Sequence, residues 1–595
     1  MSALYRLPRE ALQMICDSLL QPEPVLAHKS KGFATLLAVA ITSRFFHEHA
    51  LNAIWNTLPG YSMLLYTLPR DAWIAEVKPL GQQDLTSITE LSMIRPLVAA
   101  DFIRLKHYAW RIKHLMLPMG RDYFPKRAQN HQPRPSVLKA LADAFRLEMP
   151  GEIMLPNLFT LYVGCLDNSD LPALKILFRS VDVLFGPKLR DFFITTDRPP
   201  RDAFGAALAI LTEVCPGLLS FNTERVIRSS PLAPSVSRAL CTFDSLDVVR
   251  TGSIPISPEA LLHLAGLVSL QVLECQMELD SEDQFLAMFE HAEDKGYFPA
   301  LVDISLVHQS SLALPTVVLR AVSSPFLEAV IVEVRKGLIP AQVVKDIFTL
   351  IASRKGHAHM REVEVGVTWK FDPGDVFTFD TIKPLLALPE LTSVIVGGFA
   401  HYAIDNYALF TIATAWPHLR KLSLVPQTLD DPPKPLATLA GLISFAQNCP
   451  ELYSLGLTLN TDPRQLLTFY VVMRPGFGME QRKLVKLDVG RSRIEDPIVV
   501  AVFLSDLFPE LLEIKNDFAS EVDLEEFRGD DEDERKRILA DIVYEDRWSD
   551  VEWTYLPRFV QIRKQERNWG KKMGRKTLPP MKITHTADAT RLGDL

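Results

Sequence analysis

Two pairs of histidines have the spacing that comes nearest to metal chemistry. His357 and His359 flank one residue, as in some metal hydrolases, and His47 and His49 repeat that spacing around Glu48. A zinc site needs about four ligands in one place, and no companion cluster accompanies either pair. The first pair follows an expected helix end, where cationic groups suit the helix dipole. We therefore expect a loop at 357–359, solvated histidines at 47 and 49, and no metal.

Enzyme motifs are absent from the sequence. It contains no phosphate-binding G-x-x-x-x-G-K-[ST] loop, no G-x-G-x-x-G, no G-x-S-x-G and no H-E-x-x-H. The six cysteines include no C-x-x-C pair, and a free cysteine usually behaves as a small buried residue. We expect no catalytic residue and no cofactor, hence a non-catalytic protein. An enzyme whose site follows none of these motifs remains an alternative.

Composition indicates a folded protein. The 595 residues are 48% hydrophobic and 23% charged, with 64 Lys+Arg against 72 Asp+Glu and a net charge of −8. A mildly acidic chain offers no general attraction for nucleic acid. The N-terminus lacks a signal-peptide core, and no apolar run approaches the roughly 18 residues of a membrane span. We expect a cytoplasmic or nuclear protein that binds neither nucleic acid nor membrane.

The first sixty residues predict three helices. Leu7-Pro8 precedes apolar residues at helical spacing, and proline suits a first helical turn. We expect a second, short buried helix over Phe33–Ile41, and a third after Thr42 as its N-cap. Three helices in about fifty residues bury too little surface to be stable alone. This segment should therefore lean on the rest of the chain or on a partner.

The same segment resembles an F-box, in the form found in large fungal families. The resemblance rests on Leu7-Pro8-x-Glu10, the run Thr42-Ser43-Arg44-Phe45-Phe46, and a late Trp55. It implies docking on the Skp adaptor of a Skp–cullin–F-box ubiquitin ligase, and through that adaptor on a cullin. The long connection over 21–31 departs from many F-boxes, and a generic amphipathic helical segment is the alternative. The adaptor-binding residues that the resemblance implies are Leu7, Pro8, Glu10, Leu12, Ile15, Leu19, Phe46 and Trp55.

A repeated phrase, Pro-x-Leu-x-x-apolar, explains many of the 42 prolines. It predicts a short strand in each unit, with a helix between strands, as at Ala203–Cys215 and Pro497–Leu507. Thirteen units start between Leu158 and Leu511, 25 to 33 residues apart, and proline-less units include one that we start at Phe243. Such a unit buries its apolar face only by stacking on its neighbours.

The pattern resembles the long, irregular leucine-rich repeats that accompany F-boxes. Cys215-Pro216 and Cys449-Pro450 match the Cys-Pro-x-Leu form of those repeats, and Cys165 and Cys275 lie just past their strands. The predicted fold class is α/β, with parallel strands on a concave face and helices on the convex face. The predicted domains are an F-box at 1–60, a helical connector at 61–110, the solenoid at 111–516, and an acidic segment with a basic tail at 517–595.

Alternation along the strands selects the side chains of the concave face. Over the seven units from Leu189 to Met360 it selects 21 positions, none of which is Lys or Arg, whereas later units contribute Lys421 and Lys486. Adjacent carboxylates repel one another, so a basic segment of a partner would be favoured; acids that merely keep the face soluble are the alternative. The eight acidic positions are Asp191, Glu224, Asp247, Glu274, Asp303, Glu333, Glu362 and Glu364.

Charge changes sign near the end of the chain. Residues 521–552 hold 14 acidic and 5 basic residues, and residues 558–576 hold 8 basic and 1 acidic. The acidic run could cap the solenoid, and Lys571–Lys576 could be a nuclear-import or nucleic-acid patch. A charged flexible tail is the interpretation that we favour.

These features together predict a substrate-recognition subunit. The F-box would hold the adaptor, and the repeats would bind a protein substrate and bring it close to the ligase. An F-box and repeat scaffold with no role in degradation is the alternative. The identity of the substrate is not encoded in the repeat pattern.

Overall fold

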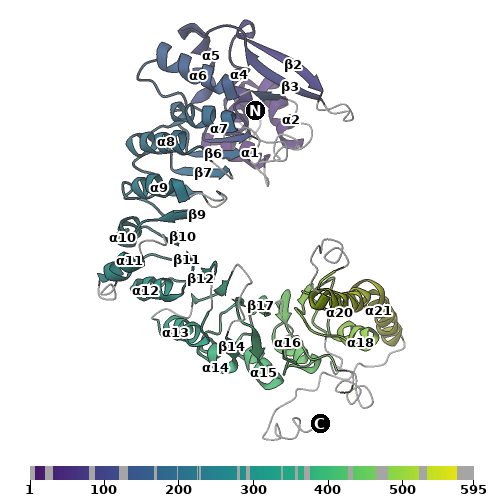
Figure 1. Ribbon diagram of the computed structural model, residues 1–595. Helices are drawn as coiled ribbons and strands as arrows, with labels where there is room; N and C mark the ends of the chain where they lie inside the picture. Colours follow the sequence, from purple (N-terminus) through teal and green to yellow (C-terminus); the bar gives the residue numbers. More distant parts are fainter. Residues whose placement is uncertain are drawn as a thin grey trace. The chain divides into compact units, whose positions relative to one another are not determined.

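The computed structural model describes residues 7–20, 31–79, 87–119, 131–133, 135–165, 171–196, 199–223, 226, 230–277, 282–289, 295–336, 339–354, 359–367, 375–426, 433–462, 464, 480–520 and 532–572. The chain forms two compact units, Met1–Leu301 and Val302–Leu595. Both units are built from strand–helix repeats (Figure 1). None of the helices in the described part of the chain is both long and apolar enough to cross a membrane.

Three helices open the first unit, as predicted: α1 (Arg9–Ser18), α2 (Lys31–Thr42) and α3 (Arg44–Asn56). The expectation of a buried second helix was wrong, because α2 buries only the stripe that includes Leu36 and Ala40. The cap prediction was also wrong. Thr42 ends α2, and its hydroxyl donates to the Ala38 carbonyl at 2.7 Å, while Ser43 precedes α3 in an extended conformation.

The connector at 61–110 is mixed rather than helical. It contains α4 (Ser62–Leu65) and α5 (Phe102–Ala109), but also two antiparallel strands, β2 (Trp73–Pro79) and β3 (Ser87–Met93). A third strand, β5 (His131–Pro133), pairs with β3 in parallel. In β3 Leu91 is buried, whereas the flanking Glu90 and Ser92 are half-exposed.

The repeats of the first unit form one parallel sheet. Its strands hydrogen-bond in chain order, starting inside the segment that we had assigned wholly to the F-box. The strands are β1 (Thr57–Leu58), β4 (His114–Met119), β6 (Thr160–Cys165), β7 (Asp191–Thr196), β8 (Ser220–Asn222), β9 (Val248–Ile256) and β10 (Val272–Met277). The helices that follow the strands from β4 to β10 are α6 (Pro135–Glu148), α7 (Leu171–Phe178), α8 (Arg201–Val214), α9 (Ala233–Leu240), α10 (Pro258–Gly266) and α11 (Glu282–Phe289).

The second unit continues the pattern, with the same parallel pairing between successive strands. Its sheet holds β11 (Asp303–His308), β12 (Ala329–Val334), β13 (Glu362–Val367), β15 (Ser393–Val396), β17 (Lys421–Leu424), β18 (Ser454–Leu457), β19 (Lys486–Asp488) and β20 (Glu513–Lys515). A separate parallel pair joins β14 (Val376–Thr378) to β16 (His401–Ala403). The helices are α12 (Ala313–Ala321), α13 (Ala341–Ala352), α14 (Phe379–Ile382), α15 (Asn406–Ala415), α16 (Leu442–Asn448) and α18 (Pro497–Leu507). The predicted leucine-rich-repeat-like α/β fold is confirmed.

The Cys-Pro-x-Leu phrase forms the turn between a helix and the next strand. Cys215 caps the C-terminus of α8, and the Leu218 amide donates to its carbonyl at 3.2 Å. Cys449 and Leu452 make the same bond after α16. Burial raises the pKa of the Cys215 thiol to about 11 and that of Cys449 to about 12. These cysteines are packed structural thiols.

The C-terminal segment is a helical cap over the part that the structure describes, and not a flexible tail. It consists of α20 (Glu532–Ser549), a π-helical turn (Asp550–Tyr555) and α21 (Leu556–Lys572). Trp548 is buried, and its indole donates to the Ser492 carbonyl at 2.7 Å. In a buried ion pair, Arg491 contacts Asp541 at 2.7 Å. The acidic run had suggested a cap, but the composition did not predict that the basic run forms part of it, because the inward-facing apolar residues are few and widely spaced among charges.

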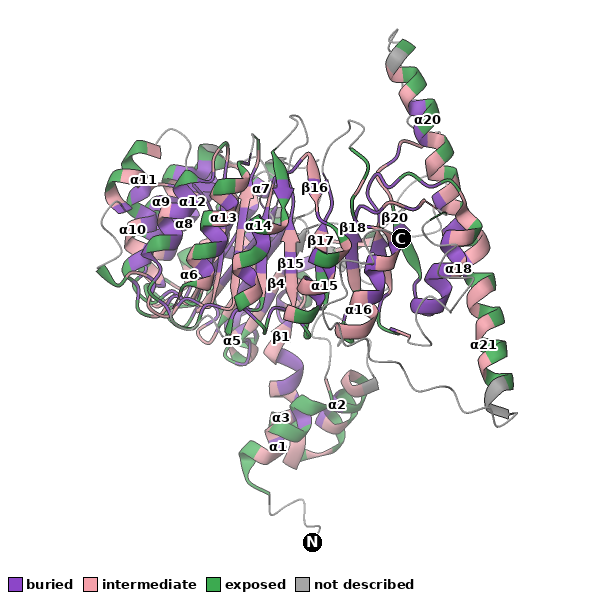
Figure 2. Ribbon diagram, turned by 90° about the horizontal axis from the view of Figure 1, so that it is seen from below, coloured by how far each residue is buried: buried purple, intermediate pink, exposed green. Residues whose placement is uncertain are grey.

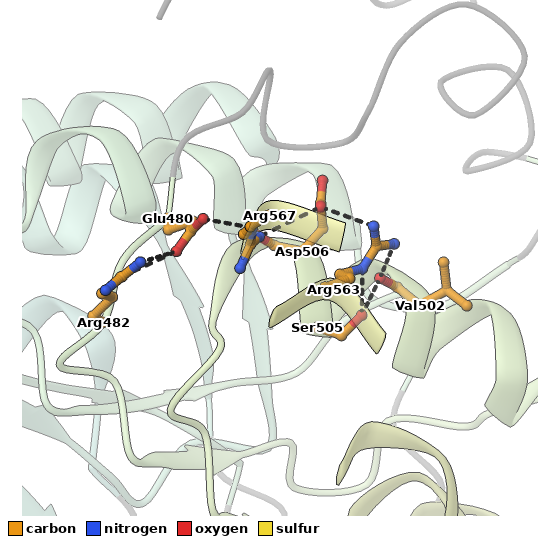
Figure 3. A network of polar contacts seen from close by, with 7 residues as sticks. All are labelled: Glu480, Arg482, Val502, Ser505, Asp506, Arg563 and Arg567. Carbon is orange, nitrogen blue, oxygen red and sulfur yellow. Dashed lines mark hydrogen bonds and ion pairs between the residues drawn. The ribbon is translucent and has the colours of Figure 1, made fainter. Parts of the chain in front are cut away.

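Basic residues of α21 hold that helix against α18 (Figure 3). The Arg563 guanidinium lies 3.1 Å from the buried Asp506 carboxylate and also donates to Ser505 at 2.9 Å. Arg567 lies 2.7 Å from Glu480. Two cations of the basic run at 558–576 therefore pack within the unit, although neither belongs to Lys571–Lys576, the segment that suggested a binding patch. Residues 573–576 of that run lie outside the described residues.

Candidate binding surfaces

The N-terminal helices expose apolar side chains on two of their faces. On α1, Met14 is 71% exposed, with Ile15 and Leu19 also outside, and on α2 Ile41 is 77% exposed, one turn beyond the exposed Leu37. The opposite stripes of both helices pack against α3. Helices α1 and α2 are apolar on both sides, and α3 covers only one side of each. Clustered exposed apolar residues are typical of interaction sites.

The residues that the F-box resemblance implied divide into two groups. Five lie on the surface: Leu7, Pro8, Glu10, Ile15 and Leu19. Pro8 stands at the N-cap of α1, where its carbonyl accepts the Leu12 amide. Leu12 and Trp55 are buried, and Phe46 is half-buried against Phe45 with ring centroids 5.0 Å apart. The residues of the buried group can position the helices that carry this surface, but they do not make up the surface itself.

Helix α3 is tied to the beginning of the repeat sheet. Trp55 stacks on Tyr108 with ring centroids 4.4 Å apart, and Glu48 pairs with the buried Arg111. The chain then passes directly from α3 into β1, which pairs with β4. The helices are therefore an extension of the first repeat, and not a module on a linker.

His47 is exposed, as expected, and His49 is half-exposed. His47 Nδ1 lies 2.7 Å from the Ala40 carbonyl, and His49 Nδ1 lies 3.4 Å from the Gln13 side chain. Both join α3 to its neighbouring helices. His357 lies outside the described residues, and in the part that the structure describes no group of three or more His, Cys, Asp or Glu side chains is arranged to hold a metal.

Side chains of the repeat strands alternate between a buried and a half-exposed face. In β11, β12 and β13 every second residue is buried under the helices, and the intervening ones lie on the open face. Each buried Val, Ile or Leu contributes roughly 1.5–3 kcal/mol, which fixes this register. The open face is thus the surface that we predicted as concave.

Most of the predicted acidic residues lie on that open face. Asp191 accepts a hydrogen bond from Thr160 at 2.8 Å, and Glu362 accepts one from Ser393 at 3.0 Å. Glu274, Asp303, Glu333 and Glu364 are half-exposed on the same face of their own units. Glu224 lies outside the described residues.

The prediction that Asp247 lies on the open face was wrong, because it assumed the wrong register for this strand. The strand pairing aligns Val248 with Ser220 and with Val272, so this repeat starts at Leu246 and not at Phe243. Asp247 then precedes the strand, and the corresponding open-face position is taken by Arg250, which lies 3.7 Å from Glu274. Phe243 misled the sequence reading because it is apolar, buried and three residues before Leu246. The open face of the first unit therefore includes a cation.

Carboxylates gather most densely on β11–β13 of the second unit. Burial, and then the neighbouring Glu333 carboxylate, raise the pKa of Glu364, while Lys421 opposes this shift. Farther along the sheet the signs alternate, since Lys486 lies 2.7 Å from Glu513 and Lys515 lies 3.0 Å from Asp488. Of the two lysines that the alternation selected there, Lys486 is paired and Lys421 is exposed. We call Asp303, Glu333, Glu362 and Glu364 the acidic face.

No family model matches the chain, and no curated protein matches it either. Among solved structures it is similar to yeast Rad7 in complex with Elc1, at 13% identity over 85% of this chain and 87% of that one, with a TM-score of 0.28. It is also similar to the leucine-rich-repeat ectodomain of the receptor kinase GASSHO1/SCHENGEN3 from Arabidopsis thaliana in complex with CASPARIAN STRIP INTEGRITY FACTOR 2, at 10% identity over 69% and 51%, with a TM-score of 0.25. At these values neither likeness bears on what the chain binds.

Proposed function

We propose that this protein is the substrate-recognition subunit of a Skp–cullin–F-box ubiquitin ligase. Helices α1–α3 dock on the Skp adaptor, and the open face of the repeats binds a protein substrate. The chain itself performs no chemistry. It raises the local concentration of substrate beside the ligase's conjugating enzyme.

The observation that carries this proposal is the apolar surface left exposed on α1 and α2. Met14, Ile15 and Leu19 on α1, and Leu37 and Ile41 on α2, remain outside while other stripes of these helices are buried. Covering apolar surface gains roughly 25 cal/mol per Å², so a partner surface of the same character would bind here. This surface coincides with the segment whose sequence resembles an F-box.

The attachment of α3 supports the same proposal. Trp55 on Tyr108 and Glu48 on Arg111 fix the helix to the first repeat. A receptor must present its substrate at a defined place relative to the adaptor, and a stiff connection increases the effective concentration more than a flexible one. Direct passage from α3 into β1 provides such a connection.

The adaptor site can be tested with matched surface variants of the full chain. Met14→Lys with Ile41→Lys places charge in the proposed contact, and should abolish co-purification of the Skp adaptor and cullin. The control is Leu147→Lys with Val268→Lys, since these residues of the same unit are 77% and 79% exposed. Equal recovery of the adaptor with both double variants would contradict the proposed site.

On the substrate side, we propose that the acidic face takes a basic segment of the substrate. The Glu364 pKa is raised first by burial and then by Glu333, so the ionised cluster carries a cost. A cation beside it would offset that cost. The interaction should weaken as salt rises.

Charge-reversal variants can show whether substrate binding depends on the position of the carboxylates or only on the net charge of the chain. Asp303→Lys, Glu333→Lys and Glu364→Lys together should weaken substrate binding and leave adaptor binding unchanged. The control reverses Asp346, Glu390 and Glu495, which are exposed outside this face in the same unit. Equal loss in both triple variants would indicate a net-charge effect and contradict the site. Substrate that binds but keeps its half-life would favour the alternative, a scaffold with no role in degradation.

A further inference from the structure

The C-terminal cap has an outward apolar stripe that no role proposed above uses. The stripe includes Trp553 of the π-helical turn, 73% exposed, and Trp569 of α21, 70% exposed. Two tryptophans this exposed on one helical segment are unusual, since exposed aromatic clusters mark interaction sites. We call the five exposed apolar residues of this segment the outer stripe: Leu539, Val543, Trp553, Ile562 and Trp569.

The inner side of the same segment is already occupied. Trp548 and Asp541 of α20, and Arg563 and Arg567 of α21, contact the last repeats. In Figure 2 the two helices run as one rod at the edge of their unit, with α18 on the inner side. The outer stripe therefore lies away from the repeats.

The π-helical turn Asp550–Tyr555 aligns the inner side of α21 with the inner side of α20, and the outer side of α21 with the outer side of α20. A π turn holds more residues per turn than an α turn, so it rotates α21 relative to α20. With this rotation, Trp548 and Arg563 both face the repeats, and Leu539 and Trp569 both face outward. A rod of 41 residues, 532–572, is about 60 Å long.

We propose that the outer stripe binds the outer stripe of a second copy of this chain, with the two rods antiparallel. A twofold axis beside Thr554 would set residue i opposite residue 1108 − i. Leu539 then meets Trp569 of the second copy, Val543 lies within one turn of its Ile562, and the two Trp553 side chains meet at the axis. The inference is independent of the proposed ligase function.

Charge complementarity favours a second copy over an unrelated partner. In the same register Asp550 lies opposite Arg558 of the second copy, and both residues are exposed. Because the contact is twofold, this pair occurs twice. A contact along rods of this length can reach the roughly 1,000 Å² that a stable interface needs.

The oligomeric state of the full chain tests this inference. Light scattering should give twice the chain mass of 67.0 kDa at micromolar concentration. Trp553→Arg should give the single-chain mass, because it sets like charges together at the axis. Leu512→Arg, at a residue 70% exposed in the same unit, should leave the dimer intact. A wild-type chain that stays monomeric, or a dimer unaffected by Trp553→Arg, would overturn the proposal.

Two further variants test the register. Asp550→Lys should weaken the dimer, and adding Arg558→Asp should restore it. Leu539→Cys with Trp569→Cys should give a disulfide-linked dimer on oxidation, since within one chain these positions are about 45 Å apart. The wild type shows the background from the exposed Cys241. A dimer that forms only after removal of residues 573–595 would make those residues the natural occupant and overturn the second copy.

Discussion

The ion pair between Arg491 and Asp541 joins the last repeats to the C-terminal helices at the level of single residues. Both side chains are nearly inaccessible, at 5% and 8% exposed, and the guanidinium also lies 5.1 Å from the Phe518 ring. Removing one partner of a buried pair leaves the other charged and desolvated, which costs more than the pair gains.

Asp541→Ala should therefore destabilise the C-terminal repeats by about 3–5 kcal/mol. Hydrogen exchange of the α18 amides in urea would measure this, because those amides lie in the affected repeats. Glu451→Ala is the control: it breaks an exposed pair with Lys483 and should change exchange little. Equal protection in both variants would show that the Arg491 pair is dispensable.

Glu364 predicts a pH dependence whose sign follows from its raised pKa. Below the ordinary glutamate range the side chain is protonated in both folded and unfolded chains. As pH rises through that range, the unfolded chain loses this proton first, so the folded state loses stability. Glu364→Gln should be more stable than wild type at neutral pH, with the difference vanishing in acid. A Gln variant that unfolds more easily at pH 7 would mean that the carboxylate is stabilised in the folded state.

Single residues also show which features of the open face could be predicted from the sequence. The alternation that placed Asp303, Glu333 and Glu364 on one face followed from strand geometry, with Pro-x-Leu starts for the first two and a single apolar start at Met360 for the third. It failed at Asp247, because the unit has no proline and Phe243 offered a second apolar anchor. The same register shift left Arg250 out of the predicted open-face positions. The side-chain pairing of Lys486 with Glu513 depended on the neighbouring strand, which spacing within one unit does not reveal.

At the scale of elements, helix and strand identities were mostly predictable, and their partners were less so. The helix expected over Pro497–Leu507 has those bounds in the structure. The three N-terminal helices were also predicted, but the exposure of Ile41 depends on what α3 leaves uncovered. The acidic run suggested a cap, but its helices were not predicted. Ile538, Trp548, Val551 and Leu556 are thinly spread among charges, and they face the same side only with the π-helical turn between α20 and α21.

The cap predicts the effect of truncation. A chain ending at Ser520 loses Trp548 and Asp541, so Arg491 and the packed side of α18 become exposed. A solenoid end without its cap is prone to aggregate, and we expect a large fall in soluble yield. A chain ending at Lys572 keeps the described cap and should behave as wild type. Soluble protein with normal α18 exchange after the shorter truncation would show that the helices are an accessory.

At the scale of the whole molecule, a helical segment with exposed apolar surface continues directly into strand–helix repeats. The repeat period and the F-box resemblance could both be derived from the sequence. The stiff passage from α3 into β1 could not, because it depends on contacts such as Trp55 with Tyr108 that are distant in the sequence. In the proposed function, this continuity connects the adaptor contact directly to the repeats that bind the substrate.

Direct titration of the purified full chain with a purified Skp-type adaptor tests the central claim. Calorimetry should give one adaptor per chain, with binding lost in the Leu7→Ala, Pro8→Ala double variant. Both residues are on the surface, so circular dichroism should show unchanged repeats. Saturable one-to-one binding that depends on these residues is the result predicted here. No binding by the wild-type chain, or equal binding by the double variant, would contradict the F-box assignment.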